Sequence, residues 1–147
     1  MSLEKNKEIV RKFIEAYNNR NLDLLDDLVA PDYFDQTHQQ KGLENLKQLM
    51  KLAFTAFPDW HETIEDIIAE GDKVWVHLTY TGTFTGEFQG LTPTGNKITT
   101  TAVDIYRIVN DKLVEGLNFT NDFDLFKSLG VIESTEEGKK FFGEDVK

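Results

Sequence analysis

Cysteine is absent from the sequence, proline occurs only three times, and no apolar run approaches the roughly eighteen residues of a membrane-spanning helix. Without cysteine, disulfides, thiol nucleophiles, iron–sulfur clusters and cysteine-ligated zinc are excluded. Basic residues are also few: 16 Lys and Arg stand against 26 Asp and Glu, for a formal net charge of −10. Because such a surface repels phosphate backbones and anionic lipids, we expect neither nucleic acid nor a membrane as a partner.

The chain length favours a single domain over residues 1–147, long enough to bury a core and still hold a ligand cavity. The charged N-terminal stretch lacks the apolar segment of a secretory signal, so we expect a cytoplasmic protein. Residues 131–147 are expected to form a charged, partly frayed tail. Their capping-box spacing from Ser134 to Glu137 would start a helix, but Gly138 is expected to interrupt it.

The first half of the chain has helical periodicity. One helix is predicted to bury a face that recurs every three or four residues, made of Ile9, Val10, Phe13, Ile14 and Tyr17. A second, shorter helix covers residues 22–29 and stops before Pro31. A third follows Gly42, carries Phe54 and Phe57 on its apolar stripe, and ends at Pro58.

The second half alternates with the period of two that is typical of strands. Strands are predicted over residues 61–69, 73–83, 97–109 and 112–121, followed by a short helix over residues 123–129 that Gly130 ends. Asn110 and Asp111 form the two-residue turn of the last hairpin. Helices followed by an antiparallel meander predict an α+β fold in which the helices pack on one face of the sheet.

The last hairpin should present two partly apolar faces. If Val109 pairs with Lys112, one face carries Thr100, Ala102, Asp104, Tyr106, Glu115, Leu117, Phe119 and Asn121. The opposite face then carries Val103, Ile105, Arg107, Val114, Gly116 and Asn118. Because neither face is purely polar, one should hold the core and a pocket while the other meets a second copy in a homodimer.

Asp104 is the carboxylate of most interest, because it lies in mid-strand among aromatic and aliphatic neighbours. Desolvation there would raise its pKa and suit it to general acid or base catalysis, whereas a lysine or arginine partner would make it structural. His38, in a loop, is a candidate pocket residue. The three histidines do not have metal-ligand spacing, so no metal is expected.

Several short stretches together resemble the SnoaL-like polyketide cyclases of the nuclear-transport-factor-two superfamily, over about residues 6–130. They are Tyr17-Asn18, Ala30-Pro31-Asp32-Tyr33, Phe57-Pro58-Asp59, Glu70-Gly71-Asp72, Gly82-Thr83, Gly86-Glu87-Phe88, Pro93-Thr94-Gly95, Arg107, Lys112-Leu113-Val114-Glu115 and Leu129-Gly130. The resemblance implies a cone-shaped fold, with N-terminal helices packed on a strongly curved antiparallel or mixed sheet around a deep pocket. It also implies a dimer through the outer sheet face and aldol chemistry without a cofactor.

The resemblance breaks down at the catalytic position. In the family pattern a glutamate is followed by a tryptophan and then by the catalytic aspartate. Laid on Glu115, this pattern places Leu117 at the tryptophan and Asn121 at the aspartate. Asp122 would reach the pocket only through a strand bulge. The family's histidine falls on Gln36, two residues before His38.

Two functions of different classes therefore remain open. The first is a cofactor-independent cyclase, isomerase or lyase that transfers a proton next to the carbonyl of a small apolar or aromatic molecule. Asp104 or Asp122 would be its base, and Asn121 would donate a hydrogen bond to the oxyanion. Its pocket would be lined by Tyr17, His38, Phe54, Phe57 and Leu117. The second is a non-catalytic ligand-binding or interaction domain.

Overall fold

The structure, a computed structural model, describes residues 2–144 and has the α+β architecture predicted from the sequence. Its helical elements are α1 (Leu3–Asn18), the 3-10 turn η1 (Leu22–Leu24), α2 (Leu25–Leu28), α3 (Leu43–Ala56), α4 (Asp122–Leu129) and α5 (Glu136–Phe142). Its strands are β1 (Val29–Asp35), β2 (Gln40–Lys41), β3 (His61–Glu70), β4 (Lys73–Thr83), β5 (Lys97–Val109) and β6 (Lys112–Thr120).

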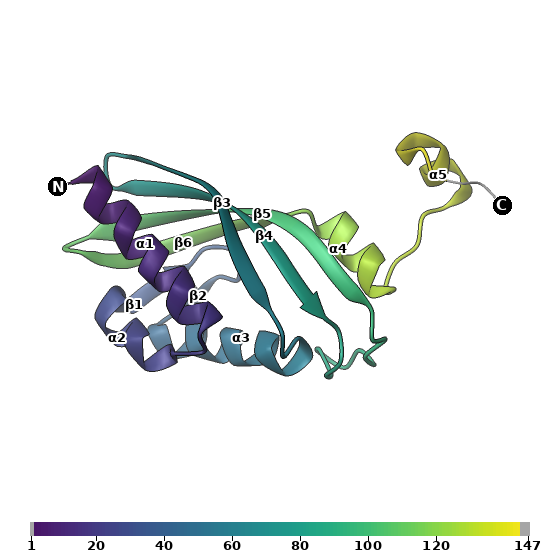
Figure 1. Cartoon of the computed structure of the whole chain (residues 1–147), viewed down its shortest axis with the longest axis horizontal. Coiled ribbons are helices and arrows are strands. Elements are labelled where there is room, and N and C mark those ends of the chain that lie inside the picture. Colours follow the sequence, from purple (N-terminus) through teal and green to yellow (C-terminus); the bar gives the residue numbers. More distant parts are fainter. Residues whose placement is uncertain (1, 145–147) are drawn as a thin grey trace.

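The described strands form one mixed sheet in the order β2-β1-β6-β5-β4-β3. β1 runs parallel to β6, whereas the other neighbouring pairs are antiparallel. Helices α1 and α3 lie on the same side of this sheet (Figure 1). α1 buries the face that its periodicity predicted, including Val10, Phe13 and Ile14. The hydrophobic core therefore lies between these helices and one sheet face.

The long meander strands match their predicted ranges closely, and β4 and β5 have the predicted bounds. At the tip of the last hairpin, Asn110 and Asp111 have φ angles of 52° and 64°. Two successive left-handed residues are what a type I′ turn requires. Strands β1 and β2 were not predicted, because Pro31 and Asp32 interrupt any alternation in the segment that forms β1.

A β-bulge in β6 changes the predicted pairing of the last hairpin. Val109 does pair with Lys112, as predicted, but Arg107 pairs with Glu115, so Val114 is an extra residue. Beyond this point β6 is turned over relative to the prediction. Asn118, not Leu117, lies opposite Asp104. The predicted pairs Thr100–Asn121, Ala102–Phe119 and Asp104–Leu117 are therefore wrong.

The tail also differs from its prediction. Gly138 does not interrupt the helix: its N–H donates to Thr135 Oγ1 at 3.0 Å, which caps the start of α5. α5 projects away from the rest of the molecule (Figure 1). The end of the predicted frayed segment, residues 145–147, lies outside the described residues.

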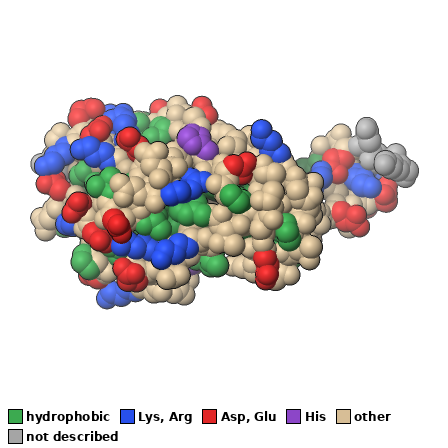
Figure 2. Space-filling model, turned by 60° about the horizontal axis from the view of Figure 1, so that its bottom comes forward, with side chains coloured by type: hydrophobic (Ala, Val, Ile, Leu, Met, Phe, Trp, Pro, Cys, Tyr) green, Lys and Arg blue, Asp and Glu red, His purple; other side chains and the backbone are tan. Residues whose placement is uncertain are grey.

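The surface carries no single dominant charge patch on the side shown in Figure 2, where acidic side chains are spread over body and tail among basic ones. None of the helices within residues 2–144 is both long and apolar enough to cross a lipid bilayer.

The sheet face that α1 and α3 leave uncovered is unusually apolar. Cross-strand pairing aligns Ile68 with Trp75, Trp75 with Ile105, and Ile105 with Leu117 in one row across four strands. Trp75 is 48% exposed and Ile68 60% exposed. Contiguous apolar surface of this kind marks an interaction site on a water-exposed protein. We define this row, together with Val103 and Phe119 beside it, as the outer apolar row.

We predict that the outer apolar row is the interface of a homodimer. Sedimentation at micromolar concentration should then give twice the chain mass of 16.9 kDa. Trp75→Glu should shift the protein to the chain mass, because a charge buried at the interface centre is strongly unfavourable. Ile132→Glu, at an exposed residue outside the sheet, is the matched control and should remain dimeric. A wild-type protein found only at the chain mass would contradict the prediction.

Candidate functional site

A cavity of about 280 Å³ lies between α1, α3 and the helix-covered face of the sheet. Most of its walls are aromatic or aliphatic. Its lining residues come from the two helices, from all strands except β2, and from the loops after β1, α3 and β4: Phe13, Tyr17, Tyr33, Asp35, Thr37, His38, Leu46, Leu49, Met50, Leu52, Ala53, Trp60, Glu62, Tyr80, Phe88, Gln89, Asp104, Tyr106, Gly116, Leu117 and Asn118. No lysine or arginine from residues 2–144 lines this cavity.

Asp104 lies in the cavity wall and is held by uncharged donors from three neighbouring strands. The Tyr106 hydroxyl donates to Oδ2 at 3.0 Å, and the Tyr80 hydroxyl contacts both carboxylate oxygens at 3.2 and 3.3 Å. The Asn118 amide donates to Oδ1. Thr120 Oγ1 donates to Asn118 Oδ1 at 2.7 Å, which orients that amide with its N–H groups toward Asp104.

The environment of Asp104 favours proton uptake. Burial raises the pKa of this carboxyl group above its ordinary value, and the donors Asn118, Tyr106 and Tyr80 oppose the rise. No cation in the described part of the chain pairs with it. The structure therefore does not show the alternative in which Asp104 is a structural acid paired with a lysine or arginine.

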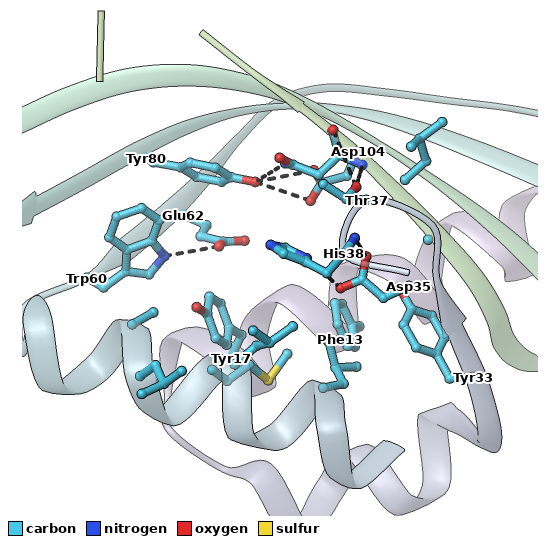
Figure 3. Close-up of a pocket in the computed structure, with 18 of the residues that line it drawn as sticks. Phe13, Tyr17, Tyr33, Asp35, Thr37, His38, Trp60, Glu62, Tyr80 and Asp104 are labelled. Atoms are coloured by element: carbon cyan, nitrogen blue, oxygen red, sulfur yellow. Dashed lines mark hydrogen bonds and ion pairs between the residues drawn. The ribbon is translucent and has the colours of Figure 1, made fainter. Parts of the chain in front are cut away.

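A second carboxyl group, that of Glu62, enters the cavity from β3. Its main chain is fixed by Asn18 at the end of α1, which accepts from the Glu62 N–H and donates to the Glu62 C=O, both at 2.8 Å. Trp60 Nε1 donates to Glu62 Oε2 at 3.0 Å. Figure 3 shows the carboxyl group between the Trp60 indole, which donates to one of its oxygens, and the His38 ring. Glu62 is only 9% exposed.

The pKa of Glu62 is raised to about 8. Burial is the main cause and the negative charge of Asp104 adds to it, while the hydrogen bond from Trp60 acts in the opposite direction. The two carboxyl groups therefore differ in how each is stabilised. Asp104 has three donors that favour its ionised form, whereas Glu62 has one, so Glu62 is the group that keeps its proton at neutral pH.

A histidine–aspartate pair stands beside the cavity in the turn between β1 and β2. The Asp35 carboxylate accepts from the His38 N–H at 3.1 Å and lies 2.8 Å from His38 Nδ1. This contact fixes the ring and leaves Nε2 free of the pair. The His38 side chain is 55% exposed, so it belongs to the open side of the cavity. In Figure 3 its ring reaches toward the space in front of Glu62 and Tyr80.

The structure brings some of the predicted site residues together and separates others. Asp104, Tyr17, His38 and Leu117 border the cavity, although Leu117 pairs with Ile105 on the face opposite Asp104. Phe54 and Phe57 do not line it. Phe54 stacks behind Tyr17 with ring centroids 4.9 Å apart, and Phe57 is core that contacts Trp60 and Phe84.

Asn121 and Asp122 also lie outside the cavity lining. Asn121 is the N-cap of α4, and its side chain accepts from the Asp124 N–H at 3.2 Å. Asp122 begins the helix and is exposed. The bulge at Val114 inverted β6, and the chain leaves the sheet after Thr120, so neither residue stands on the cavity face.

The residues that sequence reasoning missed are Glu62, Trp60, Tyr80 and Asn118. β3 contains a second bulge, at Glu65, which shifts its pairing with β4. Regular pairing counted back from the turn at Gly71 and Asp72 would put Glu62 opposite Thr81. The extra residue shifts the pairing by one, so Glu62 lies opposite Tyr80. Asn118 could have been found by allowing for one bulge in the last strand. A single extra residue replaces Leu117 by its neighbour Asn118 as the residue opposite Asp104.

Glycine at position 116 determines how closely β1 packs on β6. A Cβ atom there would collide with the hydroxyl of Tyr33 and lie 3.2 Å from Tyr106 Cε1. Only glycine therefore lets the Tyr33 ring lie flat against the sheet at the cavity edge. Within residues 2–144, no cluster of three or more histidine and carboxylate side chains is arranged to hold a metal ion.

Comparison with known proteins identifies the fold and the family. Among solved structures, the chain resembles AclR from Streptomyces galilaeus, a candidate hydroxylase, with 28% identity and a TM-score of 0.81 over 91% of this chain and 90% of that one. IdmH from Streptomyces antibioticus, a candidate polyketide cyclase, is 26% identical with a TM-score of 0.73 over 86% and 99%. TsrD from Streptomyces laurentii is 21% identical with a TM-score of 0.82 over 90% and 99%.

These neighbours and the mixed sheet over two helices show the nuclear-transport-factor-two-like fold expected from the sequence. Within that class, the family model of the SnoaL-like polyketide cyclases matches residues 7–129, and the chain belongs to that family. The match has nearly the bounds expected from the sequence motifs. No curated protein gives a significant sequence match to the chain.

The raised pKa of Glu62 predicts a specific dependence of stability on pH. The folded-state pKa of about 8 lies above the ordinary value of 4.5, so the folded protein holds a proton that the unfolded chain releases. The free energy of unfolding should therefore fall as pH rises between these two values. Glu62→Gln should remove this loss and stabilise the protein by several kcal/mol at pH 9 relative to wild type, with little difference at pH 5.

Urea unfolding of wild type and variant at pH 5, 7 and 9, followed by tryptophan fluorescence, measures this difference. Asp104 contributes a slope of the same sign in both proteins, so the informative quantity is the difference between them. Glu70→Gln, at the exposed end of the same strand, is the control and should follow wild type. If the free energy of unfolding depended on pH in the same way in wild type and Glu62→Gln, the pKa of Glu62 would not be raised.

Proposed function

We propose that the protein is a cofactor-independent enzyme that transfers a proton next to the carbonyl group of a small, largely apolar molecule, as a cyclase or isomerase does. The observation that supports this most directly is Asp104. It is a buried carboxyl group in the wall of an apolar cavity, held by Asn118, Tyr80 and Tyr106 and paired with no cation of the described chain. A carboxylate so placed is poised to accept a proton from a bound ligand.

The chemical step needs only groups of this chain. The Asp104 carboxylate takes a proton from the carbon next to the substrate carbonyl, and the electron pair of the broken C–H bond forms the enolate. In a cyclisation the enolate carbon then attacks a second carbonyl of the same molecule and forms the C–C bond. The alkoxide left on that carbonyl takes up the proton. In an isomerisation the proton returns to a different carbon.

The walls of the cavity determine the size and character of the ligand. A volume of about 280 Å³ is at the lower end of the range for small-molecule sites, so the ligand is small. The rings of Tyr17, Trp60 and Phe13 offer flat apolar surface that suits an aromatic or cyclic skeleton. A closely fitting apolar pocket also excludes water, which would otherwise protonate the enolate before ring closure.

The competing function is passive binding of a metabolite in the same cavity. The position at which the family pattern has its catalytic aspartate is Asn121, whose amide caps α4. An amide at this position is consistent with a non-catalytic protein. Membership of a family with cyclase-named members does not distinguish the two, because one fold hosts both catalytic and binding proteins. The distinguishing measurement is proton exchange, which a passive binder does not accelerate.

We predict that the protein catalyses exchange of the hydrogens next to the carbonyl of 4-phenylbutan-2-one in D₂O, measured by proton NMR. Asp104→Asn should lower the exchange rate at least about a hundredfold, because an amide does not act as a general base. Asp66→Asn, an exposed carboxylate on β3, is the matched control and should keep the wild-type rate. Saturable ketone binding without accelerated exchange would favour the passive binder.

A further inference from the structure

Glu62 is a cavity-lining carboxyl group whose hydrogen-bonding capacity the described chain leaves partly unfilled. Its Oε2 accepts from Trp60 Nε1, but its Oε1 has no hydrogen-bond partner within residues 2–144. The residue is more than nine-tenths buried and lines the cavity. Oε1 is not one of the fully buried unpaired atoms of the described chain, which belong to Asn6 and Thr100, so it remains accessible to a partner in the cavity.

The Trp60 contact also determines which oxygen carries the proton. An indole N–H is a donor only, so Oε2 must be the acceptor oxygen of the carboxyl group. In the protonated acid the carbonyl oxygen is a better acceptor than the hydroxyl oxygen, so the Trp60 contact favours the hydrogen on Oε1. Asn18 holds the Glu62 main chain through two hydrogen bonds, so the side chain starts from a fixed backbone. The result is an O–H donor aimed at the ligand space.

The groups around Glu62 favour this protonated form. Tyr17 approaches from α1, Tyr80 from β4 and Asp104 from β5, and His38 shares the cavity. The Arg20 guanidinium is directed elsewhere. It lies 4.3 Å from the centroid of the Phe54 ring and donates to the carbonyl groups of Asn18 and Pro58. Asp104 is negative when ionised, so ionisation of Glu62 as well would place two like charges in one apolar cavity.

We propose that Glu62 donates the hydrogen bond that binds and polarises the substrate's carbonyl oxygen, and that the cavity therefore selects uncharged carbonyl compounds over amines and carboxylates of the same shape. The inference rests on the proposed function, since it supplies the acid that faces the base Asp104. As negative charge develops on the carbonyl oxygen, this hydrogen bond strengthens, which lowers the energy of the enolate. The role that the sequence suggested for Asn121 thus belongs to Glu62.

Glutamine at position 62 provides a discriminating variant. Its amide oxygen can accept from Trp60, and its amino group can then donate into the cavity at every pH. Leucine removes the donor at every pH. Wild type is a donor only while Glu62 is protonated. Loss of this proton occurs near pH 8, so the three proteins should differ in how ketone affinity depends on pH.

The experiment is calorimetric titration of 4-phenylbutan-2-one into wild type, Glu62→Gln and Glu62→Leu from pH 6 to pH 9.5. Wild type should bind at pH 6 and lose affinity above pH 8, by up to about tenfold per pH unit. Glu62→Gln should bind with little change across the range, and Glu62→Leu should bind at least about tenfold more weakly than wild type at pH 6. Glu70→Gln should behave as wild type.

Two matched ligands test the charge selectivity. At pH 6, where it is a cation, 4-phenylbutan-2-amine should bind more weakly than the ketone, and so should the anion 3-phenylpropanoate. Tighter binding of the amine would overturn the proposal, because it would show that an ionised carboxylate of the cavity, Glu62 or Asp104, selects a cation over the ketone. A pH dependence retained in Glu62→Gln would also overturn it, because another group, such as His38, would then be responsible. Absence of saturable ketone binding by wild type at pH 6 would do the same.

The outcomes separate this inference from the proposed function. If the ketone binds with the Glu62 pattern but its hydrogens do not exchange, the donor role stands and the catalytic proposal fails. If exchange depends on Asp104 but ketone affinity ignores position 62, the catalytic proposal stands and the donor role fails.

Discussion

The need to hold a buried carboxylate without a cation organises this molecule. Asp104 lies on a central strand, and its three donors, Tyr80, Tyr106 and Asn118, come from that strand and both of its neighbours. Each donor is uncharged, so the site stays electrostatically unbalanced while every carboxylate oxygen is hydrogen-bonded. A lysine in place of any donor would have neutralised the charge of the carboxylate.

The same constraint explains why two carboxyl groups share one small cavity. Glu62 and Asp104 are chemically alike, yet one is surrounded by donors and the other by rings and a single indole N–H. Their surroundings therefore assign opposite tasks to similar side chains, one suited to accepting a proton and the other to presenting one. His38, held by Asp35, lies on the open side of the same cavity.

Sequence periodicity was sufficient to predict helices α1 and α3 and the long strands, but it did not predict which side chains form the site. The alternation in residues 97–109 and the turn at Asn110 predicted β5 and its hairpin, because burial of one face enforces a period of two. A bulge leaves no comparable signal. The extra residues in β6, Val114, and in β3, Glu65, each move the following side chains to the other face. Asp104 lies in β5, which contains neither extra residue, and was placed correctly. Asn118 follows Val114 in β6, and Glu62 lies beyond Glu65 when β3 is counted back from its hairpin turn, and both were missed.

The glycine at position 116 affects the shape of this cavity. The Tyr33 hydroxyl occupies the place where any other residue would carry its first side-chain carbon. Any larger residue there would have to displace the Tyr33 ring, which lines the cavity. The shape of the cavity wall therefore depends on a backbone position that makes no hydrogen bond to Asp104 or Glu62.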